Sequence, residues 1–197
     1  MGWGRITIGK MEFVDIVRHI HPLKKEDLQN LLSLSETVQV SKNTVFIEAD
    51  KPSKYIYFLQ EGICRIYYHK ADIEIILAFS FPGEAMISLN NYVYGTRGYE
   101  NIEALETSIM TRIEIASLQD LYENSTAIAN WGRKLAEFEI LKIEERLMQK
   151  LFKTASERYQ DLIRKESNIT NRVKLGFIAS YLGVTQVTLS RIRANTR

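Results

Sequence analysis

Residues 173–193 have the pattern of two short helices joined by a tight turn. Apolar side chains recur with the spacing of one helical face at Leu175, Ile178, Ala179 and Leu182. Gly183 follows, a residue that tolerates the left-handed conformation in which helices end, and Thr185 stands where a helix N-cap is expected. Leu189 and Ile192 would then face back toward the first helix. This arrangement is typical of a helix-turn-helix, whose second helix enters the major groove of DNA. A helical hairpin that only closes a domain is the alternative.

Positive charge is concentrated in the same part of the chain. The whole chain carries a formal net charge of only +2. No acidic residue follows Glu166, whereas the basic residues after it are Arg172, Lys174, Arg191, Arg193 and Arg197. A local positive field is what neutralisation of DNA phosphates requires. The charge therefore favours DNA binding over a purely structural hairpin.

Composition excludes several other classes of protein. The chain has 197 residues, enough for one large or two small domains, with 45% hydrophobic and 25% charged residues. No apolar run approaches the ~20 residues of a membrane span. Cys64 is the single cysteine and has no metal-ligand spacing with His19, His21 or His69. The chain shows no nucleophile–base constellation and no phosphate loop. We therefore expect a cytoplasmic protein without a membrane contact, a metal site, a cofactor or a catalytic site.

The rest of the chain must position the C-terminal segment. Its periodicity changes from helix to strand near Thr37 and back to helix near Ala116. Phe13 to Ile20 has the spacing of an amphipathic helix, and Pro22 is placed to open a second one. Between Thr37 and Ile113, short aromatic and branched runs alternate with turn signals, which predicts a small barrel or sandwich. The strands are expected at 38–40, 44–47, 55–59, 63–68, 73–79, 101–105 and 108–113. Residues 1–10 lack periodicity, and Met11 is an alternative start, so we set them aside.

From Ala116 onward the sequence predicts helix. No glycine or proline occurs between Arg133 and Leu175, which favours one long helix with at most one bend. Its first apolar stripe comprises Ile128, Trp131, Leu135, Phe138 and Leu141, and its second comprises Ile140, Ile143, Leu147 and Leu151. One stripe can cover the strands, so the other needs a different partner. That partner is either a second copy of the chain or the chain's own terminal helices.

The order of these elements resembles the Crp/Fnr family of bacterial transcription regulators. Residues 57–67 are similar to the family's strand-Gly-strand signature, and residues 178–193 are similar to its DNA-reading segment. The resemblance extends over roughly residues 13–193. It implies an α+β fold with an N-terminal antiparallel β-roll like a cyclic-nucleotide-binding domain, a long dimerisation helix and a C-terminal helix-turn-helix. The expected domains are 11–125 for the roll, 126–143 for the dimerisation helix and 144–197 for DNA binding.

The resemblance also implies how the protein assembles. Members of the family bind DNA as homodimers joined through the long helix. By this resemblance, the dimer interface is expected at Ile128, Trp131, Leu135 and Phe138. The expected partners are double-stranded DNA, a second copy of the chain, RNA polymerase and a small-molecule effector of unknown identity.

Many relatives bind cyclic AMP in the roll, where a Gly-Glu pair lies beside the nucleotide and a later Arg holds its phosphate. Gly83 and Glu84 match the pair, but Glu103 falls at the place of that Arg. A carboxylate repels a phosphodiester, whereas an Arg would make charge-assisted contacts with it. Glu106 would oppose an anion too, and Arg97 is expected in solvent. We therefore predict that this pocket does not bind cyclic AMP in the family's manner and is either empty or accepts another ligand. Gly83 and Glu84 are then interpreted as a turn kept for folding.

The resemblance assigns DNA contacts to the second helix of the motif. Thr185 and Thr188 match phosphate contacts, and Ser190 is expected to face the groove or the backbone. The positions that read base edges in relatives are Gln186, Val187 and Arg191. Arg191 can pair with guanine and Gln186 with adenine, while Val187 can touch a thymine methyl group.

Two functions from different classes compete at this point. The leading prediction is a sequence-specific DNA-binding transcriptional regulator that acts as a homodimer. The alternative is a cyclic-nucleotide-binding-like module that acts through a protein partner and uses its C-terminal helices only for packing. Strong, salt-dependent DNA binding would distinguish them.

Overall fold

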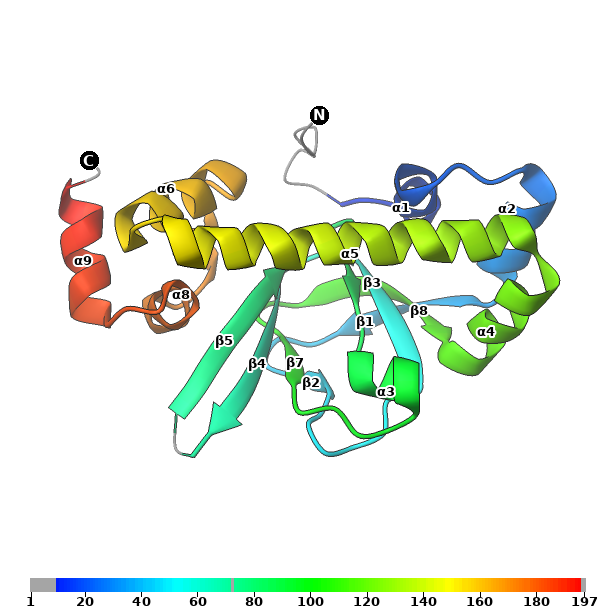
Figure 1. The fold of residues 1–197 in the computed structure, drawn as a ribbon, viewed down its shortest axis with the longest axis horizontal. Helices are drawn as coiled ribbons and strands as arrows, with labels where there is room; N and C mark the ends of the chain where they lie inside the picture. The colour runs from blue at the N-terminus through cyan, green and yellow to red at the C-terminus, as the bar shows by residue number, and fades with distance from the viewer. Residues whose placement is uncertain (1–9, 72, 196–197) are drawn as a thin grey trace.

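A β-roll lies against one long helix that runs the length of the molecule in the computed structural model (Figure 1), which describes residues 10–71 and 73–195. The strands are β1 (Ser35–Val40), β2 (Val45–Ile47), β3 (Tyr55–Glu61), β4 (Cys64–Lys70), β5 (Ile73–Ser80), β6 (Ala85–Met86), β7 (Asn101–Ala104) and β8 (Ser108–Glu114). They form two antiparallel sheets of order β1-β8-β3-β6 and β2-β7-β4-β5. The expected strands are confirmed, while the short β6 was not predicted.

The interior of the roll is filled by side chains from both sheets. Buried in it are Ile47, Tyr57, Leu59, Cys64, Met86, Ile102, Ala104 and Met110. Because side chains alternate along a strand, the neighbours of these residues point outward. In β4 and β7, Arg65 and Glu103 therefore lie on the outer face of their sheet, opposite Cys64, Ile102 and Ala104.

Most of the other helices gather in two groups, one near each end of the long helix. The helices are α1 (Phe13–Ile20), α2 (Lys25–Ser33), α3 (Leu89–Tyr94), α4 (Ile115–Asn124), the long α5 (Thr126–Phe152), α6 (Ala155–Lys165), α7 (Ile169–Arg172), α8 (Leu175–Leu182) and α9 (Gln186–Asn195). In Figure 1, α1, α2 and α4 lie near the start of α5, and α6, α8 and α9 lie near its end. No described helix has both the length and the apolar character needed to cross a membrane.

Several helix boundaries differ from the prediction. Pro22 does not open α2, which begins at Lys25 after an extended Lys24. The chain breaks at Ser125, whose hydroxyl accepts a hydrogen bond from the N–H of Ile128 and caps α5. A second break follows Phe152, where Thr154 and Glu157 form a capping box that starts α6. Helix α3 was not predicted, and residues 1–9 lie outside the described residues.

The first apolar stripe of α5 packs within its own chain. Ile128, Trp131 and Leu135 are buried, and Phe138 packs against the same cluster. The Trp131 indole N–H donates to the carbonyl of Val17 in α1 at 3.1 Å. The four residues expected at a dimer interface therefore lie in the core of one chain, because α1 covers them. The second stripe is exposed at Ile140, Ile143, Leu147 and Leu151, and so is Leu141, the last member of the first stripe.

A continuous apolar cluster joins the roll to the C-terminal helices. The roll contributes Ile63, Tyr67, Ile76, Phe79, Phe81 and Leu105. The helices contribute Tyr159, Leu162, Ile169, Val173, Ile178, Ala179, Leu182 and Leu189. We call this set the shared core. It holds the predicted helix-turn-helix against the outer face of β5, where the rings of Phe79 and Tyr181 lie 5.1 Å apart.

Candidate nucleic-acid interface

The turn between α8 and α9 has the predicted geometry. Gly183 adopts the left-handed conformation with φ 68° and ψ 35°, and its N–H donates to the carbonyl of Ser180 at 3.0 Å. The N–H of Val184 donates to the carbonyl of Ala179 at 3.0 Å. The Thr185 hydroxyl accepts a hydrogen bond from the N–H of Thr188 at 3.1 Å and caps α9. The turn therefore fixes where α9 begins and how it leaves α8.

Helix α9 presents one buried side and one exposed side. Leu189 is fully buried and Ile192 packs against the shared core, as expected. The exposed residues are Thr185, Gln186, Val187, Thr188, Ser190 and Arg191. The structure thus leaves every predicted DNA-contacting residue exposed, on α9 or at its N-cap, and the Gln186 amide lies beside Gly176 of α8. Val187 is 63% exposed, so its side chain is accessible from solvent.

Not all of the nearby basic residues are available to this surface. Arg172 Nε donates to the Glu106 carboxylate of the roll at 3.2 Å, so Arg172 joins two parts of the chain. Lys174 and Arg191 are exposed, and Arg193 is half-buried. Arg197 lies outside the described residues. The local positive field among the described residues after Glu166 therefore comes mainly from Lys174, Arg191 and Arg193.

Arg65 links the outer face of the roll to α8. Its Nε and Nη2 atoms donate to Glu103 Oε2 at 2.8 and 2.6 Å, and it also pairs with Glu74 of β5. Its guanidinium carbon lies 4.0 Å from the ring centre of Tyr67 and 3.9 Å from that of Phe177 in α8. The cation is thus held between one ring from the roll and one ring from the helix-turn-helix. The sequence analysis did not identify Arg65 or Phe177.

Ser180 forms a second contact between α8 and β5. Its hydroxyl accepts a hydrogen bond from the N–H of Ile76 at 3.1 Å and lies 3.2 Å from the carbonyl of Glu74, to which it donates. Arg146 of α5 donates to the carbonyl of the same Ile76 at 3.1 Å. Polar groups therefore fix the position of α8 along the strand, in addition to the apolar packing.

The residues expected in an effector pocket do not lie together. Glu103 points out of the roll toward Arg65, so it does not oppose a ligand inside the roll as expected. Gly83 has φ 95°, and its N–H donates to the carbonyl of Leu59 at 2.8 Å, which places Gly83–Glu84 beside β3. Glu84 Oε2 accepts from the N–H of Phe81 at 3.2 Å.

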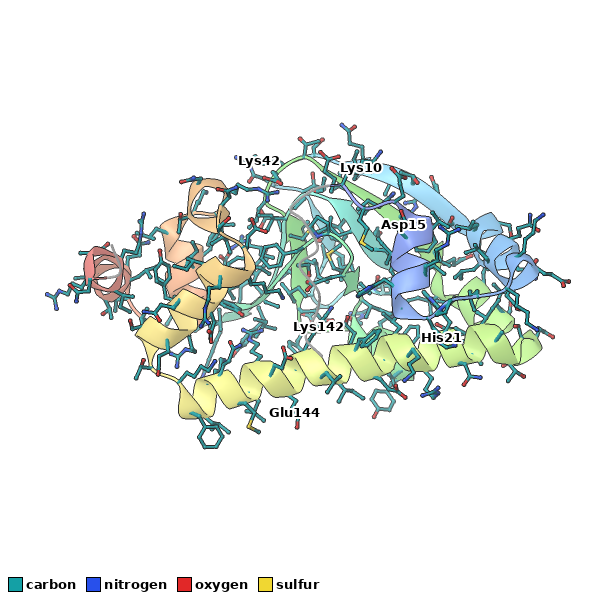
Figure 2. All side chains as sticks on the ribbon, turned by 90° about the horizontal axis from the view of Figure 1, so that it is seen from above. Lys10, Asp15, His21, Lys42, Lys142 and Glu144 are labelled. Atoms are coloured by element: carbon teal, nitrogen blue, oxygen red, sulfur yellow. The ribbon has the colours of Figure 1, made fainter. Side chains whose placement is uncertain are left out.

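Glu84 is also surrounded by basic side chains of the helices. Lys165 Nζ of α6 lies 3.4 Å from Glu84 Oε1, and Lys142 Nζ of α5 lies 3.7 Å from the same oxygen. Figure 2 shows Lys142 on the side of α5 that faces the roll. Glu84 therefore joins the roll to two helices.

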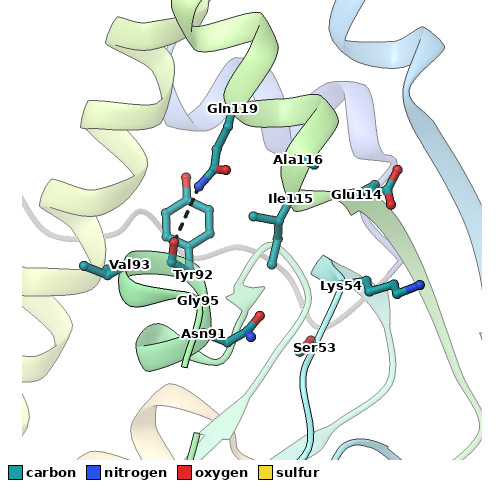
Figure 3. Close-up of a pocket in the computed structure, with 10 residues that line it drawn as sticks. All are labelled: Ser53, Lys54, Asn91, Tyr92, Val93, Gly95, Glu114, Ile115, Ala116 and Gln119. Atoms are coloured by element: carbon teal, nitrogen blue, oxygen red, sulfur yellow. Dashed lines mark hydrogen bonds between the residues drawn. The ribbon is translucent and has the colours of Figure 1, made fainter. Parts of the chain in front are cut away.

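A separate cavity lies between α3, α4 and the segment before β3. It has a volume of about 480 Å³ and is lined by Ser53, Lys54, Asn91, Tyr92, Val93, Gly95, Glu114, Ile115, Ala116 and Gln119 (Figure 3). Gln119 Nε2 donates to the carbonyl of Tyr92 across it at 3.5 Å. The cavity contains none of the predicted pocket residues.

Known proteins resemble this chain both in the sequence of the roll and in the fold of most of the chain. Residues 37–125 match the family model of the cyclic nucleotide-binding domain. FixK2 from Bradyrhizobium japonicum superposes with a TM-score of 0.71 at 21% identity, covering 82% of this chain and 83% of that one. A protein from Eubacterium rectale assigned to the Crp/Fnr family superposes with a TM-score of 0.70 at 17% identity, covering 88% and 85%. This chain has the fold of the Crp/Fnr regulators.

A further structure with the Crp/Fnr fold extends the comparison. The c-di-GMP-responsive global regulator CLP from Xanthomonas campestris superposes with a TM-score of 0.69 at 14% identity, covering 88% of this chain and 91% of that one. No curated protein matches the sequence of the chain. The Crp/Fnr fold therefore confirms the resemblance seen in residues 57–67 and 178–193, with the roll followed by a long helix and a C-terminal helix pair.

Proposed function

We propose that the chain is a sequence-specific DNA-binding transcriptional regulator of the Crp/Fnr type. The observation that carries this proposal is the exposed side of α9, where all six predicted DNA-contacting residues face solvent while Leu189 anchors the helix. A helix presented in this way, with Lys174 and Arg191 exposed beside it, suits insertion into a major groove.

Each of the six predicted DNA-contacting residues has a proposed role. Thr185 and Thr188 contact phosphates near the helix N-terminus, and Ser190 faces the groove or the backbone. Arg191 pairs with guanine, and Gln186 pairs with adenine. Val187, which is exposed, touches a thymine methyl group.

The dimer is proposed to form through the second stripe of α5. Its members Ile140, Ile143, Leu147 and Leu151 recur at spacings of three and four and are all exposed. Figure 2 places the neighbouring Glu144 on the side of α5 that points away from the body of the molecule. An exposed apolar face of this length favours contact with another protein surface, and a matching helix of a second copy is the occupant that the family predicts. Two α9 helices would then read half-sites ~34 Å apart.

The roll is proposed not to bind cyclic AMP in the family's manner. Support for this comes from Glu84, which is already engaged by Lys142, Lys165 and the N–H of Phe81. Arg97 is exposed, as expected for a residue that does not hold a buried phosphate. Isothermal titration with cyclic AMP is expected to show no binding in the micromolar range, and micromolar binding would refute this part of the proposal.

Selection of binding sites from genomic DNA with the purified chain, with and without cyclic AMP, tests the proposal as a whole. A two-fold symmetric site recovered equally in both samples is expected. A site recovered only with cyclic AMP would contradict the proposal for the roll. Failure to enrich any site at low salt would contradict DNA binding and favour a module that acts through a protein partner.

A further inference from the structure

Ser88 and Glu100 are buried polar residues with unpartnered oxygen atoms. Ser88 is 1% exposed and Glu100 is 7% exposed. Among the described residues, Ser88 Oγ and Glu100 Oε1 are buried side-chain oxygens without a hydrogen-bond partner. The other carboxylate oxygen, Glu100 Oε2, accepts from the N–H of Tyr99 at 3.1 Å. Buried polar atoms nearly always have partners, so two orphans indicate a group that belongs beside them.

The two side chains converge on Gly98. A Cβ atom at Gly98 would stand 2.1 Å from Ser88 Oγ and 2.8 and 3.0 Å from the two carboxylate oxygens of Glu100. The backbone at this point is anchored, because the Gly98 carbonyl accepts from the N–H of Asp50 at 2.9 Å. Ser88, Gly98 and Glu100 therefore form a small polar niche, which we call the Glu100 niche. It lies where the start of α3 meets the loop that leads into β7.

The Glu100 niche differs from its surroundings in charge. Four other glutamates of the roll each have a basic partner. Glu74 and Glu103 pair with Arg65, Glu84 with Lys142 and Lys165, and Glu106 with Arg172. Glu100 forms no ion pair with any described residue, and Arg97, three positions before it, is exposed. A buried carboxylate without a cation is costly, so its retention suggests that a cation is supplied from outside the chain.

We propose that the Glu100 niche binds the protonated amino group of a small-molecule effector; this rests on the proposed function as a transcriptional regulator, whose effector would bind to the roll. An ammonium group carries three N–H donors and a positive charge, which suits acceptance by Glu100 Oε1 and Ser88 Oγ together. An anionic group is repelled at this position. One carboxylate and one hydroxyl are too few oxygen ligands for Ca²⁺, which takes about six to eight. Entry is through the irregular loop at 95–100, where Tyr99 is exposed.

The test is a titration of the full chain with methylammonium chloride, followed by the amide signals of Gly98 and Tyr99 in heteronuclear NMR. A saturable shift of both signals is expected. Tetramethylammonium chloride at the same concentration has the same charge but no N–H donor, so it should leave both signals in place. Equal shifts with the two salts would overturn the proposal, and so would the absence of saturation, which would mean that water alone fills the niche.

Two substitutions assign the effect to the niche. Glu100→Gln keeps the shape and removes the charge, and it should weaken methylammonium binding by at least about tenfold, a factor that corresponds to ~1.4 kcal/mol. Glu106→Gln is the control, because Glu106 lies beyond the other end of β7 and already has Arg172 as a basic partner, and it should leave the affinity unchanged. Equal affinity in wild type and Glu100→Gln would overturn the proposal even if both variants fold normally.

A ligand screen separates this inference from the proposed function. Primary amines are tested for an increase in the melting temperature of wild type, and compounds that act through the niche lose the effect in Glu100→Gln. DNA binding is measured on the same samples by fluorescence anisotropy with a selected site. DNA binding with no response to amines would refute the niche alone, whereas a response to amines without DNA binding would refute the regulator.

Discussion

Replacing Arg65 with methionine would reveal how strongly the ion network between the roll and α8 contributes to folding. The Arg65 side chain is 7% exposed and that of its partner Glu103 is 10% exposed. Removing the cation leaves a carboxylate buried without its partner, which typically costs ~3–5 kcal/mol. Methionine is unbranched and still fills the space between the rings of Tyr67 and Phe177, so the cost of a cavity stays small.

The chain offers a matched control in Arg112. This residue also lies on a strand, pairs with a glutamate (Glu36, 2.7 Å) and lies over a tyrosine ring (Tyr55, 4.5 Å). Its side chain is 31% exposed and that of Glu36 is 60% exposed. Because exposed ion pairs contribute only ~0–1 kcal/mol, Arg112→Met should cost little. The two substitutions remove contacts of the same kinds, but Arg65 has two carboxylates and two rings as partners, whereas Arg112 has one of each and is more exposed.

The assay is urea unfolding of both variants, followed by tryptophan fluorescence and circular dichroism. With a slope of ~2 kcal/mol per molar urea, Arg65→Met should lower the midpoint by about 2 M, and Arg112→Met by less than about 0.5 M. The double variant Arg65→Met/Glu103→Gln should recover part of the loss, because it no longer buries an unpaired charge. Equal shifts for the two single variants, or no recovery in the double variant, would refute the reasoning.

Further predictions concern DNA binding, assembly and the thiol. Arg191→Ala should weaken binding to the selected site by ~1–3 kcal/mol and relax specificity at one base pair, measured by anisotropy on a set of single-base variants; equal losses on every sequence would make Arg191 a phosphate contact only. If the proposed dimer forms through the second stripe, Leu147→Glu should give a monomer in sedimentation and a melting temperature that no longer depends on protein concentration, and a dimeric Leu147→Glu variant would exclude this interface. Ile128→Ala should lower the melting temperature at every concentration, because it removes part of the core of one chain. Burial raises the pKa of Cys64 to about 12, so its thiol should react with iodoacetamide at pH 8 only after unfolding, and fast labelling of the native chain would contradict that burial.

Local signals account for most of what could be predicted from the sequence. The helix-turn-helix depends on Gly183 and Thr185, whose conformational preferences act within a few residues, and the structure has both in the expected roles. The break before α6 had a local signal as well, because Thr154 and Glu157 have the spacing of a capping box. A capping box is strong evidence that a new helix starts. The absence of glycine and proline is only weak evidence that one helix continues.

Contacts between distant segments could not be predicted in the same way. Which apolar stripe of α5 is buried depends on α1, which covers Trp131 from more than a hundred positions away in the sequence. The direction of Glu103 depends on strand register, since a shift of one residue reverses the face to which a side chain points. Arg65 did carry a signal, as a charged residue between Cys64 and Ile66 in an apolar run, but nothing local identifies Glu103 or Phe177 as its partners.

The shared core limits how modular this protein can be. Residues such as Tyr67 and Phe79 of the roll and Ile178 and Leu182 of α8 exclude water from one another. A fragment that ended after α5 would expose the roll's half of that core, so we expect the two halves to unfold as one cooperative unit. Exchange of the DNA-binding half between relatives would succeed only if the inward side of α8 were matched to the new roll. The exposed residues of α9 are free of this constraint, so the side chains proposed to contact DNA can change while the interior stays the same.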